Sequence, residues 1–342
     1  MIKKLWIDNY KALNEFEISF MPFTLLIGNN AVGKSSVMEA MDFLAGSVKE
    51  SFDIVLERRK QTVQNIVSRL KASSKICFAC EVELKTGNEQ KILTWELQIR
   101  AFAEKNLMVL ERERITDKAE GTDYLLFDSE QGGFLKGKKK LELPALSYKI
   151  SILNHIDTEN DEKVFPELTA FKRFWERTAF FGMLSPEKMR ASEKEQVSTI
   201  GRAGNKLPSF IQSMSAPRLL EYYKRLNGLM GEKIVSVSAK PNHTFDYVIL
   251  HTVENYGGRK LDVTSEELSD GMLRLLAIVA ITEMDESYTL FMADEIENGI
   301  NVNYLESLIK ILKEACAEKQ QQFIMTTHST VFADYMDPKE MV

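Results

Sequence analysis

The stretch "IGNNAVGKSS", residues 27–36, decides the fold. It fits the pattern G-x-x-x-x-G-K-[ST], with Gly28, Gly33, Lys34 and Ser35 at the fixed positions. Glycine lets backbone N–H groups wrap closely around a phosphate chain, and the helix that follows directs its positive N-terminal end at the anion. The lysine then reaches the β- and γ-phosphates, and the hydroxyl ligates Mg²⁺. The residues predicted to hold a nucleoside triphosphate are Gly28, Asn29, Asn30, Ala31, Val32, Gly33, Lys34, Ser35 and Ser36.

The pattern has this meaning only between a strand and a helix. The apolar run "FTLLI", residues 23–27, is suited to a buried strand. In "KSSVMEAMDFLAG", Val37, Met41 and Leu44 recur at helical spacing, and Gly46 is the predicted C-cap. The alternative is a chance match in a glycine-bearing loop, and the predicted strand and helix argue against it.

Composition limits the classes of protein that the chain can belong to. Of its 342 residues, 44% are hydrophobic and 27% charged, which is ordinary for a soluble protein with one large or two moderate cores. The net charge of -6 argues against a protein coated in nucleic acid, although it allows a local basic patch. The sequence has no apolar run of transmembrane length, and the N-terminus lacks the apolar core of a signal peptide, so we expect a cytosolic protein.

Cys77 and Cys80 form the one C-x-x-C pair in the chain. They lie in "KICFACEVEL", where apolar and polar residues alternate as in a strand. Because three-residue spacing places two strand side chains on opposite faces, we expect two separate strand residues rather than a zinc site.

The chain divides into three predicted regions. Residues 1–114 contain a first hairpin, the phosphate loop and a predicted antiparallel meander: "KICFACEVEL", "KILTWELQIRAF" and "LMVLERERI". Residues 115–230 are predicted as an insertion, less apolar up to about residue 165 and mostly helical after it. Residues 231–342 form a predicted C-terminal lobe with the order strand, helix and strand, which favours parallel βαβ connections and an α/β fold. The closing "ADYMDPKEMV" is expected to lead into another strand.

Two strands of the C-terminal lobe end in residues suited to chemistry. "TLFMADE" delivers Asp294 and Glu295 to the carboxyl end of an apolar strand, where ligands bind in open α/β sheets. We expect Asp294 to hold Mg²⁺ and Glu295 to orient or deprotonate an attacking water. "IMTTHS" similarly delivers His328, which can contact a γ-phosphate. The alternatives are a solvated acidic strand end and a histidine packed at a strand end.

The segment "ELSDGMLR" contains Ser269, Asp270 and Gly271 just before an apolar helix. Ser269 is a reasonable N-cap, and Gly271 leaves the backbone open at the helix start. On these residues alone, an ordinary capped helix and a second phosphate-binding site both remain open.

The order of "GNNAVGKSS", "LSDGM", "LFMADE" and "TTHS" resembles the Walker A, signature, Walker B and switch-histidine motifs of ABC-type ATPase heads, and more closely the SMC-related RecF- and OLD-like ATPases. "LSPEKMR" and "DEIENGIN" are similar to the middle segment and the turn after Walker B in that family, whereas "LSDGM" departs from the transporter form LSGGQ. The resemblance implies an ABC-type P-loop head with a mixed sheet, a β meander and a helical insertion. It also implies two ATP molecules sandwiched in a homodimer or higher homo-oligomer, where Ser269 and Gly271 bind the γ-phosphate held by Lys34 of the facing subunit.

The same resemblance narrows the kind of ATPase. The interval between Walker A and the signature is too long for a transporter subunit and lacks the coiled coil of an SMC protein. The chain has no D-x-D pair of the kind an OLD-type nuclease domain would bring. The expected function is a compact head that controls a separate effector, a nuclease or toxin, in bacterial antiviral defence. The alternative is a RecF-like DNA-repair ATPase, for which Lys136–Lys140 could contact DNA phosphates or form only a solvated turn.

Overall fold

The computed structural model describes residues 1–29, 32–87, 89–242 and 247–342. Two predicted loop residues, Asn30 and Ala31, lie outside the described residues. The chain forms two compact units, and each is described here by itself. The first unit holds residues 1–21 and 29–178, and the second holds residues 22–28 and 179–342. The chain therefore passes from one unit to the other within the phosphate-loop sequence.

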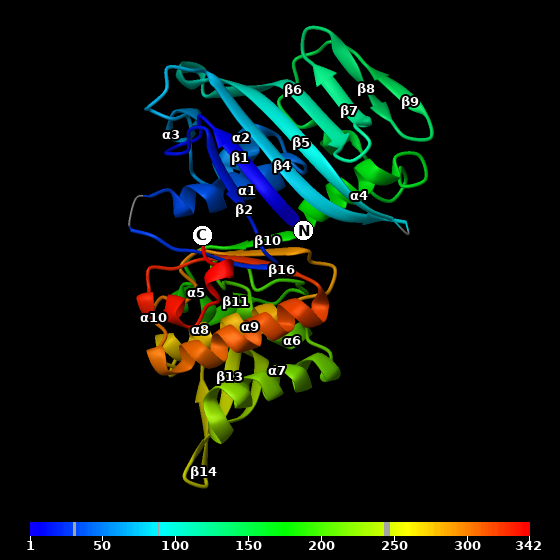
Figure 1. Ribbon diagram of the computed structural model, residues 1–342. Helices are drawn as coiled ribbons and strands as arrows, with labels where there is room; N and C mark the ends of the chain where they lie inside the picture. Colours follow the sequence, from blue (N-terminus) through cyan, green and yellow to red (C-terminus); the bar gives the residue numbers. More distant parts are fainter. Residues whose placement is uncertain (30–31, 88, 243–246) are drawn as a thin grey trace. The chain divides into compact units, whose positions relative to one another are not determined.

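An antiparallel sheet is the framework of the first unit (Figure 1). Within the described residues its strands follow the order β2-β1-β4-β5-β6-β7-β8-β9. The bounds are β1 (Ile2–Asp8), β2 (Phe16–Ser19), β4 (Lys75–Thr86), β5 (Glu89–Phe102), β6 (Leu107–Asp117), β7 (Asp123–Asp128), β8 (Gly132–Lys136) and β9 (Lys140–Leu143). The predicted hairpin and three-strand meander are confirmed. The meander also continues through β7, β8 and β9, which the sequence did not reveal because the edge strand β9 is exposed along most of its length.

Alternating burial explains why the meander strands form. In β4 every second residue is buried, from Ile76 to Leu84, so one face of the strand contributes to the core. Cys80 lies on that buried face, whereas Cys77 is partly exposed on the other, and neither thiol forms a disulfide. The prediction of two separate strand cysteines is confirmed.

Helices pack against one face of this sheet (Figure 1). They are α1 (Lys34–Ser47), α2 (Phe52–Arg58), α3 (Val63–Ile66) and α4 (Pro166–Glu176). Aromatic rings join α4 to β5: the ring centroid of Trp95 lies 5.7 Å from that of Phe171 and 5.6 Å from that of Trp175. Large rings of this kind bury the most apolar area per residue, so this cluster anchors α4 to the sheet.

A buried carboxylate, Glu113 of β6, lies beneath the aromatic cluster with 0% of its surface exposed. It accepts hydrogen bonds from Trp95 Nε1 at 2.9 Å, Ser151 Oγ at 2.5 Å and the Ile152 N–H at 2.6 Å. Burial raises the pKa of the Glu113 carboxyl to about 7, and the three hydrogen bonds offset only part of that effect. The ionised form of Glu113 therefore opposes folding of the first unit.

Replacing Glu113 with glutamine should flatten the pH dependence of the first unit's stability between about pH 5 and about pH 8. Because the folded-state pKa lies above the ordinary value of 4.5, stability is fully present below that value and is lost as pH rises through about 7. That shift corresponds to a loss of about 3 kcal/mol in the wild-type free energy of unfolding. Urea unfolding followed by tryptophan fluorescence measures it, because Trp6, Trp95 and Trp175 all lie in this unit.

Glu111, on the same strand, provides the matched control. Burial raises the pKa of Glu111, but hydrogen bonds from Gln98, Lys75 and Arg100 outweigh it and hold that pKa below its ordinary value. Its titration is therefore complete below about pH 5, and Glu111→Gln should leave the slope between about pH 5 and about pH 8 unchanged. Identical slopes for wild type and Glu113→Gln would contradict the assignment of Glu113.

The second unit contains a sheet in which β15, β16 and β3 run parallel to one another. Its order within the described residues is β10-β15-β16-β3. The bounds are β3 (Phe23–Leu26), β10 (Thr178–Phe181), β15 (Leu290–Ala293) and β16 (Gln322–Thr326). Helix α9 (Leu305–Lys319) connects β15 to β16, so the predicted parallel βαβ connection is confirmed. The expected approach to another strand is also confirmed, since Met341 forms a parallel bridge with Leu25.

The second unit has further elements besides the long apolar helix α8 (Asp270–Thr282). They are α5 (Pro186–Met189), α6 (Leu207–Ser213), α7 (Ala216–Met230), α10 (Thr330–Asp334) and a second sheet of β11 (Ala191–Glu193), β12 (Ile234–Asn242), β13 (Tyr247–Tyr256) and β14 (Arg259–Thr264). Helix α8 contacts α7 and α9, and most of its residues are buried, which explains its apolar body. Lys319 Nζ donates to the carbonyls of Thr282 and Met284, so a cation satisfies the C-terminal end of α8.

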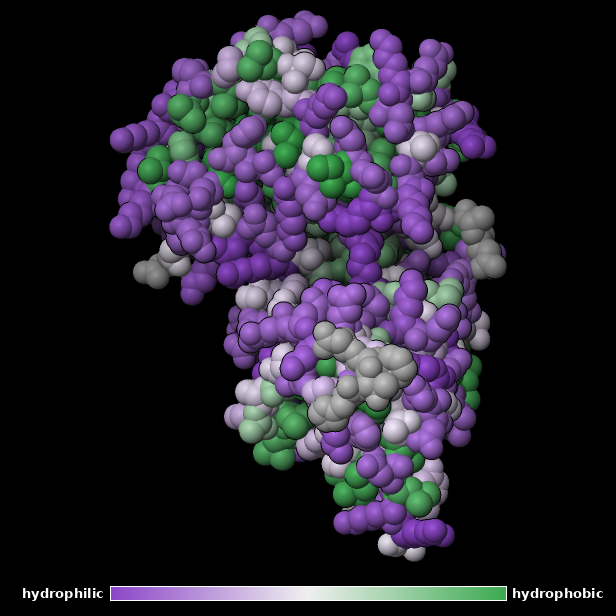
Figure 2. Space-filling model, turned by 180° about the vertical axis from the view of Figure 1, so that it is seen from behind, coloured by the Kyte–Doolittle hydropathy of each residue, from purple (hydrophilic) through white to green (hydrophobic). Residues whose placement is uncertain are grey.

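The compact units divide the chain at places other than the predicted boundaries of residues 114 and 230. β6 pairs with β7 across the first of these, and α7 packs against α8 and β12 across the second. The described residues contain no helix long and apolar enough to cross a membrane. On the face in Figure 2, apolar side chains are dispersed among hydrophilic ones.

Candidate active site

The phosphate-loop sequence has the structural context that its pattern requires. Strand β3, buried along its length, precedes Gly28, and helix α1 begins at Lys34. Gly33 is the N-cap of α1 with a left-handed φ of 107°, and a Cβ at that position would lie 3.1 Å from Leu13 Cδ2. The conformation therefore favours glycine, and the space beside Leu13 is tight for any side chain.

Lys34 and Ser35, in the first turn of α1, differ in their exposure to solvent. The Lys34 side chain is buried, with 8% of the residue exposed, and its Nζ donates to the Asn29 carbonyl at 3.1 Å. Val32 and Ser35 are exposed, and Ser36 is half-buried. Val37, Met41 and Leu44 are buried, which confirms the predicted apolar face of the helix.

Gly46 is not the C-cap that the sequence predicts. Helix α1 continues to Ser47, and Val48 is its C-cap. A Cβ at Gly46 would lie 2.9 Å from a methyl group of Val55, so glycine is required there by the close approach of α2 rather than by the end of a helix.

Asp294 and Glu295 follow β15 in the second unit and have separate partners. Thr326 Oγ1 donates to Asp294 Oδ1 at 2.5 Å, and the same oxygen accepts the Glu295 N–H at 2.9 Å. Glu295 adopts a left-handed φ of 49°, which is uncommon for this residue type. Both residues thus follow the end of β15 at Ala293, and their carboxylates have different partners.

Glu295 and His328 lie together at neighbouring strand ends. His328 Nε2 is 3.2 Å from Glu295 Oε1, and the side chains are 36% and 29% exposed. Asn298 Nδ2 donates to the other Glu295 oxygen at 3.4 Å. A carboxylate that is oriented by an imidazole and still open to solvent is suited to hold and activate a water molecule.

Two residues that the sequence reasoning missed hold this arrangement. Thr326 links the backbone and carboxylate at the end of β15, as described above. Glu297 Oε1 accepts hydrogen bonds from Thr327 Oγ1 at 2.5 Å and from the His328 N–H at 3.1 Å. The turn after β15 is thereby fixed to the loop that carries the histidine. The acidic repeat in "DEIEN" is the sequence signal that could have identified Glu297.

The signature segment begins helix α8, in the same unit. Ser269 Oγ accepts the Met272 N–H at 3.2 Å, so the predicted N-cap is confirmed. A Cβ at Gly271 would lie 3.1 Å from the Gly299 carbonyl, which places the helix start against the turn after β15. The structure thus brings the start of α8 close to the turn that carries Glu297.

The described residues contain no group of three or more His, Cys, Asp or Glu side chains placed to hold a metal. Mg²⁺ bound with a nucleotide commonly takes one or two protein oxygens and completes its shell with phosphates and water. The Ser35 hydroxyl of the first unit and the Asp294 carboxylate of the second are each a donor of that type.

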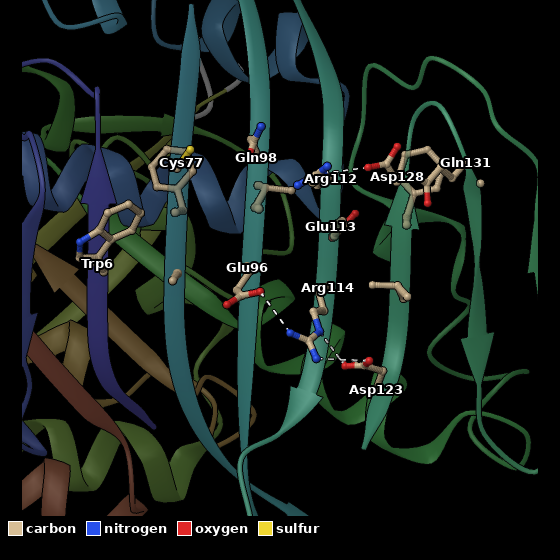
Figure 3. A pocket seen from close by; sticks show the side chains of 16 residues that line it. Trp6, Cys77, Glu96, Gln98, Arg112, Glu113, Arg114, Asp123, Asp128 and Gln131 are labelled. Carbon is tan, nitrogen blue, oxygen red and sulfur yellow. Dashed lines mark hydrogen bonds and ion pairs between the residues drawn. The ribbon is translucent and has the colours of Figure 1, made fainter. Parts of the chain in front are cut away.

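A hollow of about 780 Å³ lies on the exposed face of the first unit's sheet (Figure 3). Its arginines are already paired: Arg112 with Asp128, and Arg114 with Asp123 and Glu96. None of the predicted site residues lines it. Lys136 and Lys140, in the β8–β9 hairpin, are exposed, and lysines at an edge strand also discourage pairing with other chains.

Comparisons with known proteins agree with this architecture. A family model described as "AAA domain, putative AbiEii toxin, Type IV TA system" matches residues 85–334, and one described as "AAA ATPase domain" matches residues 1–124. An "ATP/GTP phosphatase" of Helicobacter pylori is 23% identical over 353 residues, covering 98% of this chain and 88% of the relative. An "OLD nuclease" of Thermus scotoductus is 20% identical over 358 residues, covering 98% of this chain but 60% of the relative.

Among solved structures, a "SmcHead bound to the C-winged helix domain of ScpA" is similar in fold, with a TM-score of 0.58 and 12% identity. The match covers 98% of this chain and 92% of that one. The predicted fold class and family resemblance are confirmed.

Proposed function

This chain belongs to the family described as "AAA domain, putative AbiEii toxin, Type IV TA system" and is an ATPase, and from that premise we propose that two copies close around ATP and thereby control a partner effector. The observation that carries the proposal is the Glu295–His328 pair at the ends of two parallel strands. These strands belong to the sheet whose β3 leads into the phosphate loop.

In the proposed site, the loop from Gly28 to Ser36 holds the triphosphate of ATP. Lys34 neutralises the β- and γ-phosphates, and Ser35 and Asp294 bind Mg²⁺. Glu295 takes a proton from the attacking water, and His328 keeps the glutamate in place and contacts the γ-phosphate. Mg²⁺ supplies charge neutralisation at the phosphates when bound.

The proposed assembly uses Ser269 and Gly271 to complete the ATP site of a facing subunit. Two features support it: Ser269 is exposed, and the start of α8 presents backbone N–H groups and the positive end of a helix dipole. A two-fold pair places the same surface on both subunits, so two ATP molecules would be enclosed.

Replacing Ser269 with arginine should block ATP-dependent pairing and lower hydrolysis by about 10²-fold, because a bulky cation would occupy the place of the γ-phosphate. Binding of ATP to the single subunit should survive. Sedimentation with Mg²⁺–ATP and steady-state hydrolysis measure the two effects. Ser215→Arg is the matched control, because Ser215 is an exposed serine that precedes helix α7 of the same unit. Hydrolysis by Ser269→Arg at the wild-type rate would remove the two-subunit site.

We propose a nuclease or toxin as the controlled effector, and antiviral defence as the setting, because the family is described with a "putative AbiEii toxin" and one relative is an "OLD nuclease". Native mass determination of the complex from its own host, with and without ATP, tests this. A nuclease or toxin that remains bound in a nucleotide-dependent manner supports effector control.

The second candidate is a DNA-repair ATPase, which the exposed lysines of the β8–β9 hairpin favour: Lys136, Lys138, Lys139 and Lys140. Duplex DNA binding that weakens with salt and with replacement of these lysines would support it.

A further inference from the structure

Arg190, which follows helix α5, contacts the segment that leads into the signature helix α8. Its Nη1 donates to three backbone carbonyls and its Nη2 to one carboxylate: Ser265 O at 2.5 Å, Glu266 O at 3.0 Å, Leu268 O at 3.1 Å and Asp270 Oδ1 at 2.9 Å. In return, Ser265 Oγ donates to the Arg190 carbonyl. A single guanidinium thus holds the segment that ends at Ser269.

Asp270 is one of the two residues by which "LSDGM" differs from the transporter form LSGGQ, and its carboxylate is 61% exposed at the start of α8. A carboxylate at this place stabilises the helix dipole. It also places a negative charge next to the backbone N–H groups that the proposed function assigns to a γ-phosphate. A carboxylate and a phosphate that lie at the same helix start repel each other unless a cation compensates one of them.

We infer that Arg190 is the positioning residue of the signature segment and that its charge compensates Asp270, so that the start of α8 can accept the phosphate of a facing subunit. This inference rests on the proposed two-subunit site. It assigns to Arg190 two tasks that can be separated: the three carbonyl contacts hold the backbone, and the Asp270 contact sets the charge.

A double-mutant cycle separates the two tasks. The variants are Arg190→Ala, Asp270→Asn and their combination, with the dissociation constant of the Mg²⁺–ATP-dependent dimer measured by sedimentation. We expect Arg190→Ala to weaken the dimer by about tenfold or more while ATP affinity of the single subunit stays within about twofold. Asp270→Asn alone should not weaken the dimer. The double variant should recover the part of the loss that the uncompensated anion causes, and the loss that remains measures the three carbonyl contacts.

Arg190→Lys keeps the positive charge but loses the planar fork that reaches several carbonyls. We expect it to keep the dimer within about threefold of wild type. This variant tests the inference even if Arg190→Ala does not fold. Failure of Asp270→Asn to restore the dimer in folded Arg190→Ala, or a loss in Arg190→Lys as large as in Arg190→Ala, would overturn charge compensation.

The same assay distinguishes this inference from the proposed function. If Ser269→Arg blocks the dimer and Arg190→Ala does not weaken it, the two-subunit site stands and the role of Arg190 fails. If wild-type protein and Ser269→Arg have the same dissociation constant for the Mg²⁺–ATP-dependent dimer, the two-subunit site fails. The inference then fails with it.

Discussion

Glu295→Gln should lower single-turnover ATP hydrolysis by about 10²–10⁴-fold and leave ATP binding intact, because the amide keeps the size and hydrogen bonding of the glutamate but cannot accept a proton. Glu295 Oε1 lies 3.2 Å from His328 Nε2 and its side chain is partly open to solvent, which supports this role. Since ATP would remain uncleaved, the variant should accumulate as an ATP-loaded, closed dimer.

Rapid-quench hydrolysis alongside sedimentation in Mg²⁺–ATP measures both effects. Glu306→Gln is the matched control, because Glu306 is an exposed glutamate of α9 in the same unit. His328→Ala should slow turnover without necessarily trapping the dimer, and loss of the Asp294 carboxylate should weaken Mg²⁺–ATP binding itself. Near-normal hydrolysis by Glu295→Gln would remove Glu295 from the chemistry and leave the base to be found elsewhere.

Lys34→Ala should weaken ATP binding by about 10²-fold or more, since loss of one partner of a desolvated charge pair costs about 2–5 kcal/mol. The first unit should keep its fold, because Lys34 lies in the first turn of α1 and its Nζ donates to a carbonyl of its own loop. Titration calorimetry with Mg²⁺–ATP measures the affinity, and tryptophan fluorescence reports the fold. Lys105→Ala, an exposed lysine of the same unit, is the control. Unchanged affinity in Lys34→Ala would mean that residues 28–36 do not form the ATP site.

Local patterns predicted much of the architecture. The alternation in β4 and the helical spacing after Lys34 reflect burial of one face, and the apolar runs of β15 and β16 reflect burial of both faces. Burial of either kind leaves a recognisable pattern in a short stretch of sequence. Strands β7 to β9 could not be found in this way, because strands at a partly exposed edge have no strict alternation.

The residues that hold the candidate site in place were harder to predict from the sequence. Thr326 and Glu297 acquire their roles only because β15 and β16 lie side by side, which brings residues about 30 positions apart into hydrogen-bond distance. Arg190 contacts a segment about 80 positions away. The limits of the compact units depend in the same way on long-range pairing, and composition alone does not record it.

Strand β3 has an unusual consequence for biosynthesis. It precedes its neighbours in the sheet, β16 on one side and Met341 on the other, by about 300 residues. At about 5–20 residues per second, a ribosome needs roughly 15–60 s to supply them. During that time residues 29–178 can already fold, whereas the apolar "FTLLI" has no neighbouring strand with which to pair. The nascent chain therefore has a long interval in which this segment is open to chaperones or to aggregation, and the strand that leads to the phosphate loop can pair only once β16 has been made.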